Sequence, residues 1–476
     1  MRTVPDGSLM DRAAAGLAAR CVAWLPRVYG ARVVVLVGTG SNGGDALFAG
    51  ALLARRGAGV VAVALDAERL HAGGAAALLR AGGRIRALDT IPDLAVAVDR
   101  ADLILDGIVG IGTTGALRAP ADEVVQTAND ASGLRVAVDL PSGVHPDTGV
   151  VDGPAFRADR TVTLGAIKLG LTVGEGREHV GDLGVVDIGL ARHLAAPAAL
   201  RLTDADVAEV LPRAGDGDDK YSGGILGVAA GSAGYPGAAV LTVGAALRMR
   251  SSLVRYVGPA DLGVSSAWPV ALVSDGVPSE IGRVQAWAVG PGLGRDKRAE
   301  QVLADVLQRD LPVVVDADGL RLLAERPELL QRRSVAGSPQ PPFGPASAGR
   351  STVLTPHDRE FSAFGVPLGA DRVRAASALA TQLGVTVLLK GAATIVVDPD
   401  GHTYVNATGT AALASAGTGD VLTGIIGSLL AAGMEAGLAA ALGAHVHGRA
   451  GQLAERAGAL LASDVIDAIP PARGFT

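Results

Sequence analysis

The chain is poor in cysteine, in aromatic residues and in basic charge. Cys21 is its only cysteine, which excludes an intrachain disulfide and any zinc site built from several thiolates. Aromatic residues make up 3% of the chain, and its formal net charge is -6. Because it has neither a base-stacking platform nor a global basic surface, we do not expect a nucleic acid as a partner.

Long hydrophobic runs are also missing. The apolar stretch at residues 421–434 is too short to cross a bilayer, and residues 1–12 contain two aspartates and no apolar core of signal-peptide length. We therefore expect no membrane partner and a cytoplasmic location.

Hydrophobic residues make up 49% of the 476 residues, which is enough for a sizeable core. Short Val-rich runs, such as RVVVLVG at residues 32–38, alternate with helical segments, and after a break near residues 193–199 a second series begins at residue 225. Continuous apolar runs of this length indicate parallel strands that are buried on both faces. The sequence predicts two α/β domains, residues 1–198 and 199–476, and a mobile surface loop in the proline-rich stretch 337–349.

A glycine loop follows the first predicted strand. Residues 38–43, GTGSNG, match G-x-G-x-x-G and open a helix, which is typical of a dinucleotide-binding turn. However, Asp45 places a carboxylate in the first turn of that helix, where it would repel a pyrophosphate. The alternative is that the glycines only form a tight strand-to-helix turn.

Polar residues gather at the ends of the predicted strands of the first domain. Asp106 precedes a second glycine turn at residues 110–115, and Asp139 precedes Ser142. Because parallel strands end at one edge of the sheet, we expect Asn42, Asp45 and these residues to converge. Oxygen ligands without cysteine or histidine suit a hard cation. Each aspartate alone could equally cap a turn.

A third glycine turn, residues 416–420 (AGTGD), runs into an apolar stretch that predicts an amphipathic helix. Its glycines and the helix N-terminus suit a phosphate. Asp420 is then either a base that takes a proton from an attacking hydroxyl or a cap of the helix. Both interpretations stay open on the local sequence.

Together the motifs resemble those of a known family, the bifunctional enzymes that repair hydrated NADH and NADPH. In this family an NAD(P)HX epimerase is fused to an ADP- or ATP-dependent NAD(P)HX dehydratase. The first-domain motifs are SNGGD (41–45), DGIVGIGTTG (106–115), DLPSG (139–143) and TLGAIKLGL (163–171). Those of the second domain are KYSGG (220–224), GSAGYPGAA (231–239), GPGLG (290–294), DADGL (316–320), LTPHDREF (354–361), LKGAAT (389–394) and NATGTAALASAGTGDVLTG (406–424).

For the first domain the resemblance implies a Rossmann-like, three-layer fold and an epimerase site. Asp139 would transfer the proton at the hydroxyl-bearing C6 of the ring, assisted by Lys168, although a solvated lysine is the alternative for Lys168. Asn42, Asp106 and Ser142 would hold a potassium ion. The hydrated nucleotide would be bound by Asp139 and by Ser41, Asn42, Gly43, Gly44, Asp45, Gly110, Ile111, Gly112, Thr113, Thr114, Gly115 and Ala116.

For the second domain the resemblance implies a ribokinase-like fold in which nucleotide phosphorylates the C6 hydroxyl and phosphate then leaves. Asp420 would be the base, and Mg²⁺ would accompany ADP or ATP. NAD(P)HX, that is NADHX or NADPHX, would contact Asp420, Ala238, Gly292 and His357, although His357 could equally be a hydrogen-bonded structural histidine. The nucleotide would be bound by Lys390, Gly391, Ala392, Ala393, Thr394, Gly417 and Gly419.

The resemblance also implies a homo-oligomer. Two other functions remain open on the sequence. One is a ribokinase-like kinase of a small alcohol whose first domain is a regulatory nucleotide-binding module. The other is an N-terminal domain that only senses nucleotide. A dehydrogenase is a third and weaker alternative, based on the first glycine loop alone.

Overall fold

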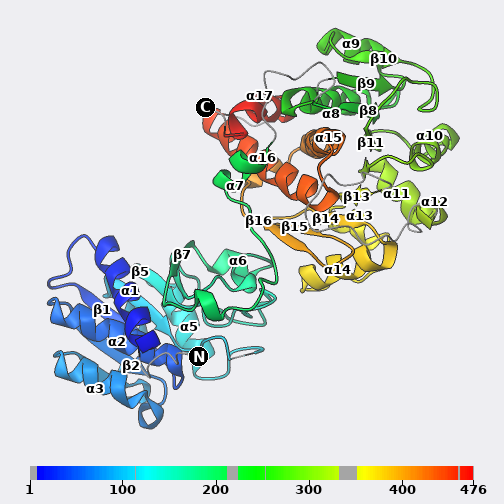
Figure 1. Cartoon of the computed structure of the whole chain (residues 1–476). Coiled ribbons are helices and arrows are strands. Elements are labelled where there is room, and N and C mark those ends of the chain that lie inside the picture. Colours follow the sequence, from blue (N-terminus) through cyan, green and yellow to red (C-terminus); the bar gives the residue numbers. More distant parts are fainter. Residues whose placement is uncertain are drawn as a thin grey trace. The chain divides into compact units, whose positions relative to one another are not determined.

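The computed structural model describes residues 8–112, 114–211, 223–251, 253–331, 351–458 and 461–474. They form two compact units, Met1–Pro197 and Ala198–Thr476 (Figure 1). The predicted loop at 337–349, Thr113 and Lys220 lie outside the described residues.

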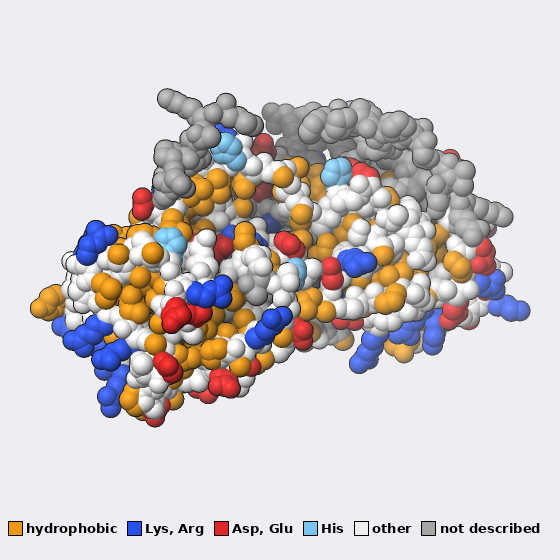
Figure 2. Space-filling model, turned by 90° about the horizontal axis from the view of Figure 1, so that it is seen from below, with side chains coloured by type: hydrophobic (Ala, Val, Ile, Leu, Met, Phe, Trp, Pro, Cys, Tyr) orange, Lys and Arg blue, Asp and Glu red, His pale blue; other side chains and the backbone are white. Residues whose placement is uncertain are grey.

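None of the described helices combines the length and the apolar character needed to cross a bilayer. On the face shown in Figure 2, described side chains of both charges are interspersed with apolar ones.

The N-terminal unit is built on a seven-stranded sheet of order β3-β2-β1-β4-β5-β6-β7. Every pair of neighbouring strands is parallel, which confirms the parallel sheet predicted from the Val-rich runs. The strands are β1 (Arg32–Val37), β2 (Gly59–Ala64), β3 (Arg84–Ala87), β4 (Leu103–Gly107), β5 (Leu134–Val138), β6 (Arg160–Leu164) and β7 (Asp182–Val186).

Helices cover both faces of this sheet (Figure 1). Alternate residues of β1 point to opposite faces: Val33 and Val35 belong to a core shared with α1, α2 and α3, whereas Val34 and Leu36 belong to a core shared with α4 and α5. The unit therefore has three layers. Its helices are α1 (Ser8–Trp24), α2 (Ser41–Arg55), α3 (Ala72–Arg80), α4 (Leu94–Asp99), α5 (Ala121–Asn129) and α6 (Gly176–His179).

The C-terminal unit is built on a nine-stranded sheet of order β10-β9-β8-β11-β12-β13-β14-β15-β16. The strands from β10 to β14 pair in parallel, and β15 and β16 add an antiparallel edge. The strands are β8 (Ile225–Ala229), β9 (Leu253–Val257), β10 (Leu272–Ser274), β11 (Ala286–Val289), β12 (Val313–Val315), β13 (Thr352–Leu354), β14 (Thr386–Leu389), β15 (Thr394–Val397) and β16 (Thr403–Asn406).

The main core of this unit lies between the sheet and a layer formed by α8, α15, α16 and α17 (Figure 1). The helices are α7 (Asp204–Val210), α8 (Pro236–Met249), α9 (Asp261–Ala267), α10 (Lys297–Leu307), α11 (Asp318–Glu325), α12 (Glu328–Gln331), α13 (Asp358–Ser362), α14 (Arg372–Leu383), α15 (Thr418–Ala431), α16 (Ala436–Ala457) and α17 (Ala462–Ala472). Both units thus confirm the predicted α/β class.

Helix α15 corrects one prediction. The sequence favoured an amphipathic helix after the third glycine turn, but every residue from Val421 to Ala431 is buried. The reason is its position: α15 packs against α8, α16 and α17 as well as strands β8, β11 and β12, so it has no solvent face. The turn that begins this helix is consequently held by the core of the unit.

Candidate active sites

The first candidate site lies at the carboxyl ends of β1, β4 and β5, which are neighbours in the sheet. Asn42 and Asp45 lie on α2, directly after β1; Asp106 lies within β4, and Asp139 follows β5. All four side chains are buried. The structure therefore brings together the polar residues that sequence reasoning expected to converge.

Asp139 and Lys168 form the centre of this site. Their side chains make an ion pair and are only 12% and 16% exposed, respectively. Lys168 Nζ also donates to Leu164 O over 2.9 Å, and Asp139 Oδ1 accepts from Leu164 N over 2.9 Å. The alternative that Lys168 is a solvated lysine is therefore wrong. Asp139 adopts the left-handed backbone conformation, with φ of 66°, which is a strain typical of functional positions.

Asp45 is electrostatically coupled to this pair. Burial, followed by the negative charge of Asp139, raises the pKa of Asp45 from 3.8 to about 7, whereas Lys168 acts in the opposite direction. The sequence predicted Asp45 in the first turn of α2, and this prediction was wrong. Asp45 is the fifth residue of the helix, and the first turn contains no acidic residue. A buried carboxyl that titrates near neutrality can hold or release a proton during a reaction.

Asp106, Ser142 and Asn42 form a second cluster close to the first. Ser142 donates to Asp106 from its backbone N over 2.8 Å and from its hydroxyl over 2.7 Å. Val109 links the cluster, because its N donates to Ser142 Oγ over 3.2 Å and its O accepts from Asn42 Nδ2 over 2.6 Å. Burial raises the pKa of Asp106 to about 6. The hydrogen bonds from Ser142 and Ile108 act in the opposite direction, but their effect is smaller than that of burial.

The predicted nucleotide-binding segments border this cluster. A Cβ on Gly110 would lie 3.2 Å from Asn42 Cβ, whereas Gly112 and Gly115 face open space. Ile111 is exposed, as are Ser41, Thr114 and Ala116, while Gly43 and Gly44 are buried. The segment after β4 is thus an open rim beside buried polar groups. Thr163, which sequence reasoning did not single out, donates to Asp139 over 3.2 Å.

The second candidate site is the third glycine turn. Gly417 is the N-cap of α15 and adopts the left-handed conformation with φ of 87°, and no side chain caps the helix. Among the described residues, none donates a hydrogen bond to the Asp420 carboxylate. The alternative that Asp420 merely caps the helix is therefore wrong. The turn instead leaves this carboxylate available, as a base requires.

The surroundings of Asp420 change its acidity. Burial, followed by the negative charge of Asp316, raises the pKa of Asp420 from 3.8 to about 7; Lys390 lowers it, and Asp318 raises it further. A carboxyl group with this pKa exchanges protons near neutral pH, which is the property of a general base that works at neutrality.

A partly buried ion pair lies beside the turn. Lys390 Nζ lies 2.7 Å from Asp316 Oδ1 and 4.0 Å from Glu360 Oε2, and Thr423 of α15 donates to Asp316 Oδ2 over 2.8 Å. A Cβ on Gly419 would lie 3.6 Å from both Lys390 Nζ and Asp316 Oδ2. Sequence reasoning found Lys390 but not Asp316, Glu360 or Thr423, although each lies inside a motif. The position of Asp316 directly after β12 was the available signal.

The other predicted residues of this site fall into two groups. Ala238 and Gly292 lie together, since a Cβ on Gly292 would be 2.8 Å from Ala238 Cβ. His357 accepts from Arg359 N over 3.1 Å and caps α13, with 47% of its side chain exposed. This geometry gives His357 the structural role that was its alternative, while leaving its ring accessible.

The predicted nucleotide segment connects β14 to β15. It follows Lys390, with Gly391 and Ala392 exposed, Ala393 buried and Thr394 starting β15. Arg372, which sequence reasoning missed, donates to Lys390 O over 2.9 Å and pairs with Asp358. This arginine joins the segment to α13 and α14.

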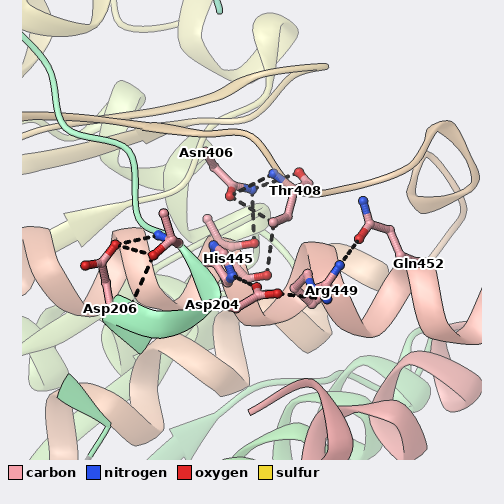
Figure 3. A network of polar contacts seen from close by, with 9 residues as sticks. Asp204, Asp206, Asn406, Thr408, His445, Arg449 and Gln452 are labelled. Carbon is pink, nitrogen blue, oxygen red and sulfur yellow. Dashed lines mark hydrogen bonds and ion pairs between the residues drawn. The ribbon is translucent and has the colours of Figure 1, made fainter. Parts of the chain in front are cut away.

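A polar network holds the chain that leads to the glycine turn (Figure 3). Asn406, at the end of β16, donates to Thr408 O over 3.0 Å, and Thr408 Oγ1 donates to the carbonyl of His445 on α16 over 3.0 Å. The His445 ring lies 2.8 Å from Asp204 of α7, which also pairs with Arg449 over 2.9 Å. The segment that leads from β16 to the glycine turn is therefore hydrogen-bonded to α16.

Comparison with protein-family models gives two matches. Residues 226–471 match the model described as NAD(P)H-hydrate dehydratase, and residues 6–170 match that of the YjeF-related protein N-terminus. The two matches fall in the C-terminal and N-terminal units, respectively.

Curated proteins match nearly the whole chain. The bifunctional NAD(P)H-hydrate repair enzyme Nnr of Mycobacterium leprae is 46% identical over 95% of this chain and 90% of its own length. The enzyme of the same name from Mycobacterium tuberculosis is 45% identical over 93% of this chain and 88% of its own length. Among solved structures, ADP/ATP-dependent NAD(P)H-hydrate dehydratase from Bacillus subtilis, co-crystallised with ATP/Mg²⁺, is 29% identical, with a TM-score of 0.47 over 57% of this chain and 96% of its own.

Proposed function

Because the chain belongs to the family of bifunctional NAD(P)H-hydrate repair enzymes, we propose that it restores hydrated nicotinamide nucleotides in two reactions. The N-terminal unit interconverts the R and S epimers of NADHX and NADPHX. The C-terminal unit uses ADP or ATP to dehydrate the S epimer to NADH or NADPH. The observation that carries the proposal is Asp420, a carboxyl with a pKa of about 7 and no capping role, in a glycine turn beside Lys390.

In the dehydratase reaction, Asp420 takes the proton of the C6 hydroxyl, and the hydroxyl oxygen attacks the terminal phosphorus of the nucleotide. The bond from that phosphorus to the bridging oxygen breaks, and the shortened nucleotide leaves. The C6–O bond of the phosphate ester then breaks, because phosphate is a far better leaving group than hydroxide. A proton lost from the neighbouring carbon restores the ring double bond.

The geometry of the second site supports this mechanism. Lys390, held by Asp316 and facing Gly419, supplies positive charge for the transferring phosphoryl group. Residues 390–394 bind the nucleotide, with Gly417 and Gly419 on its phosphates. Ala238 and Gly292 contact the NAD(P)HX, together with the exposed ring of His357.

Mg²⁺ is proposed as the companion of the nucleotide phosphates, whose charge it would neutralise. Among the described residues, no three Asp, Glu, His or Cys side chains come together as a metal-binding group. Within the part of the chain that the structure describes, the ion would therefore be held chiefly by the nucleotide phosphates.

In the epimerase reaction, Asp139 moves the proton at C6 and Lys168 holds its carboxylate in place. Asp45, with its pKa of about 7, exchanges protons with this pair. The hydrated nucleotide is bound by the buried glycines 43 and 44 and by residues 110–116, of which 110–112 and 114–116 belong to the described rim.

Potassium is proposed for the cluster of Asp106, Ser142 and Asn42. Asp106 is 0% exposed, and among the described residues only neutral groups donate to it. A buried carboxylate without a cationic partner is costly, and the cluster offers only oxygen ligands, so the residues fit a hard monovalent cation. The ion would supply positive charge near the rim where the nucleotide binds.

The test is incubation with a mixture of R- and S-NADHX and either ADP or ATP. Conversion of the whole mixture to NADH, followed by its absorbance, supports both activities. Conversion of only the S-NADHX fraction supports the dehydratase alone. A stable phosphorylated product would contradict the dehydratase and favour the kinase alternative. A comparison of rates with ADP and ATP determines the preferred nucleotide. A cytoplasmic location and a homo-oligomer stay predictions.

A further inference from the structure

A pocket of about 170 Å³ lies beside the second site and has no role in the reaction described above. It is smaller than the ~300–1,000 Å³ of sites that enclose a complete small ligand, so it suits one part of a larger molecule. We call it the switch pocket. Its lining comprises Ala230, Gly231, Ser232, Ala233, Val257, Gly258, Pro259, Gly276, Leu293, Asp296, Arg298, Ala299 and Val302.

The switch pocket lies at the point where the strand order reverses. From β8 the chain adds β9 and β10 on one side and then β11, β12 and β13 on the other. Apart from Val257, the last residue of β9, the lining residues come from the segments that follow β8, β9, β10 and β11. In open α/β sheets this crevice, outside the carboxyl ends of the strands, is where ligands bind.

The floor of the switch pocket is rigid. The buried Tyr256 hydroxyl donates to Ala230 O over 3.0 Å and accepts from Ala260 N over 2.9 Å, which ties the ends of β8 and β9 together. Gly258 has φ of 154°, and a Cβ there would lie 3.0 Å from Tyr256 Cζ, so the floor requires glycine. The pocket is therefore formed before any ligand arrives.

The lining offers apolar walls and a cation at the rim. Small apolar residues and glycine backbone make a surface that a flat aromatic base can approach closely. Asp296 is held by a hydrogen bond from Ala299 N over 2.9 Å. The exposed Arg298 guanidinium forms no hydrogen bond or ion pair with another described residue, so it is available to a phosphate.

The position of the switch pocket suits one end of a dinucleotide. Leu293 of its lining follows Gly292, and a Cβ on Gly231 would lie 3.0 Å from Ala239 Cβ, next to Ala238. Three strand intervals, about 14 Å, separate β9 from β12, the strand that Asp316 follows. The proposed nucleotide segment, between β14 and β15, lies on the opposite side of Asp316. A ligand in the pocket would therefore reach Asp420 from the side that the nucleotide leaves free.

We infer that the switch pocket binds the adenosine half of NAD(P)HX, and that Arg298 contacts one of its phosphates. The inference rests on the proposed dehydratase function. The phosphate is either the pyrophosphate, which NADHX and NADPHX share, or the 2′-phosphate, which only NADPHX carries. Arg298 is thus a binding residue for the part of the substrate that does not react.

The test compares Arg298→Ala and Ala233→Phe with wild type and with Arg295→Ala, the matched control. Ala233 is exposed, so a phenylalanine there fills the mouth of the pocket without entering the core, and Arg295 is an exposed arginine outside the lining. Steady-state kinetics are measured with S-NADHX and S-NADPHX at saturating ATP, and the KM for ATP is measured separately.

Arg298→Ala should raise the KM for NADPHX about tenfold or more, the effect of losing a charge-assisted hydrogen bond, with kcat and the KM for ATP little changed. An equal rise for NADHX assigns the contact to the pyrophosphate, and no rise for NADHX assigns it to the 2′-phosphate. Ala233→Phe should raise the KM for both substrates.

The inference is overturned if both variants behave as Arg295→Ala does, or if only kcat falls. Failure of the proposed function looks different, because the wild-type protein itself would then form no NADH.

Discussion

Lys390 Nζ lies 2.7 Å from Asp316 Oδ1, and the two side chains have opposite effects on Asp420: Asp316 raises its pKa and Lys390 lowers it. The pair comes from the ends of β12 and β14, and Asp420 comes from the first turn of α15. Burial and Asp316 outweigh Lys390, so the Asp420 carboxyl titrates near neutrality rather than near pH 4. The acidity of Asp420 therefore depends on both members of the pair.

Asp420→Asn should lower kcat of dehydration by about 10²–10⁴-fold, because an amide of the same shape cannot accept the hydroxyl proton. Binding of ATP, measured by calorimetry, should change little. Thermal unfolding provides the control: removing a half-buried charge leaves the melting temperature equal or higher, so a lower melting temperature would assign the loss to misfolding instead.

Asp316→Asn should move the acid limb of the dehydratase pH profile to lower pH. A general base works above its pKa, so the wild-type kcat/KM should fall as pH decreases through about 7, the pKa of Asp420. Removing the negative charge of Asp316 lowers the pKa of Asp420, so the acid limb of the profile moves to lower pH. Asp318→Asn is the matched control and should cause a smaller shift in the same direction. An unmoved limb in both variants would show that another group controls it.

Asp45→Ala should slow epimerisation by about 10²-fold or more, because it removes a carboxyl that exchanges protons near neutrality. Epimerisation is followed by separating the R and S epimers over time. If the first glycine loop belonged to a dehydrogenase, the same change would relieve repulsion of a pyrophosphate and improve binding of NAD. Dehydration of purified S-NADHX, a reaction of the other unit, is the internal control.

Lys168→Met should destabilise the N-terminal unit by about 3–5 kcal/mol, because Asp139 stays buried without its ion-pair partner. Chemical unfolding measures this loss, and Asp139→Asn combined with Lys168→Met should recover part of it. Lys168→Arg keeps the charge and should retain more stability than Lys168→Met. Equal stability of all the variants would show that the pair contributes nothing to the fold.

Replacing K⁺ by Li⁺ should lower both the epimerase rate and the melting temperature of the N-terminal unit, since Asp106 would lose its proposed counter-ion. Returning K⁺ should restore both. In Asp106→Asn, with no buried carboxylate to neutralise, the melting temperature should no longer depend on the cation. A wild-type melting temperature that is equal in K⁺ and Li⁺ would contradict a potassium site in this cluster.

Much of the fold was predictable from local patterns. Val-rich runs on the scale of strands, separated by helical segments, predicted the parallel sheets, since strands buried on both faces lack polar residues. The helix after residue 417 was predicted, but its amphipathic character was wrong. Its glycine and serine residues suggested a solvent-exposed face, whereas the neighbouring helices and strands bury them. The partners of Lys390 were also missed. Asp316 lies 74 residues away from it in the chain, and no local pattern reports such a contact.

The sequence by itself determined the α/β class, the three glycine turns and the convergence of Asn42, Asp45, Asp106 and Asp139 at strand ends, because these depend on strand periodicity and on the rule that parallel strands end at one edge. Only the tertiary structure decided that Lys168 is an ion-pair partner and that Asp420 is a carboxyl free of any capping role, with a pKa of about 7. The physical reason is that a pKa depends on burial and on charges from distant segments, and these exist only when the chain is folded.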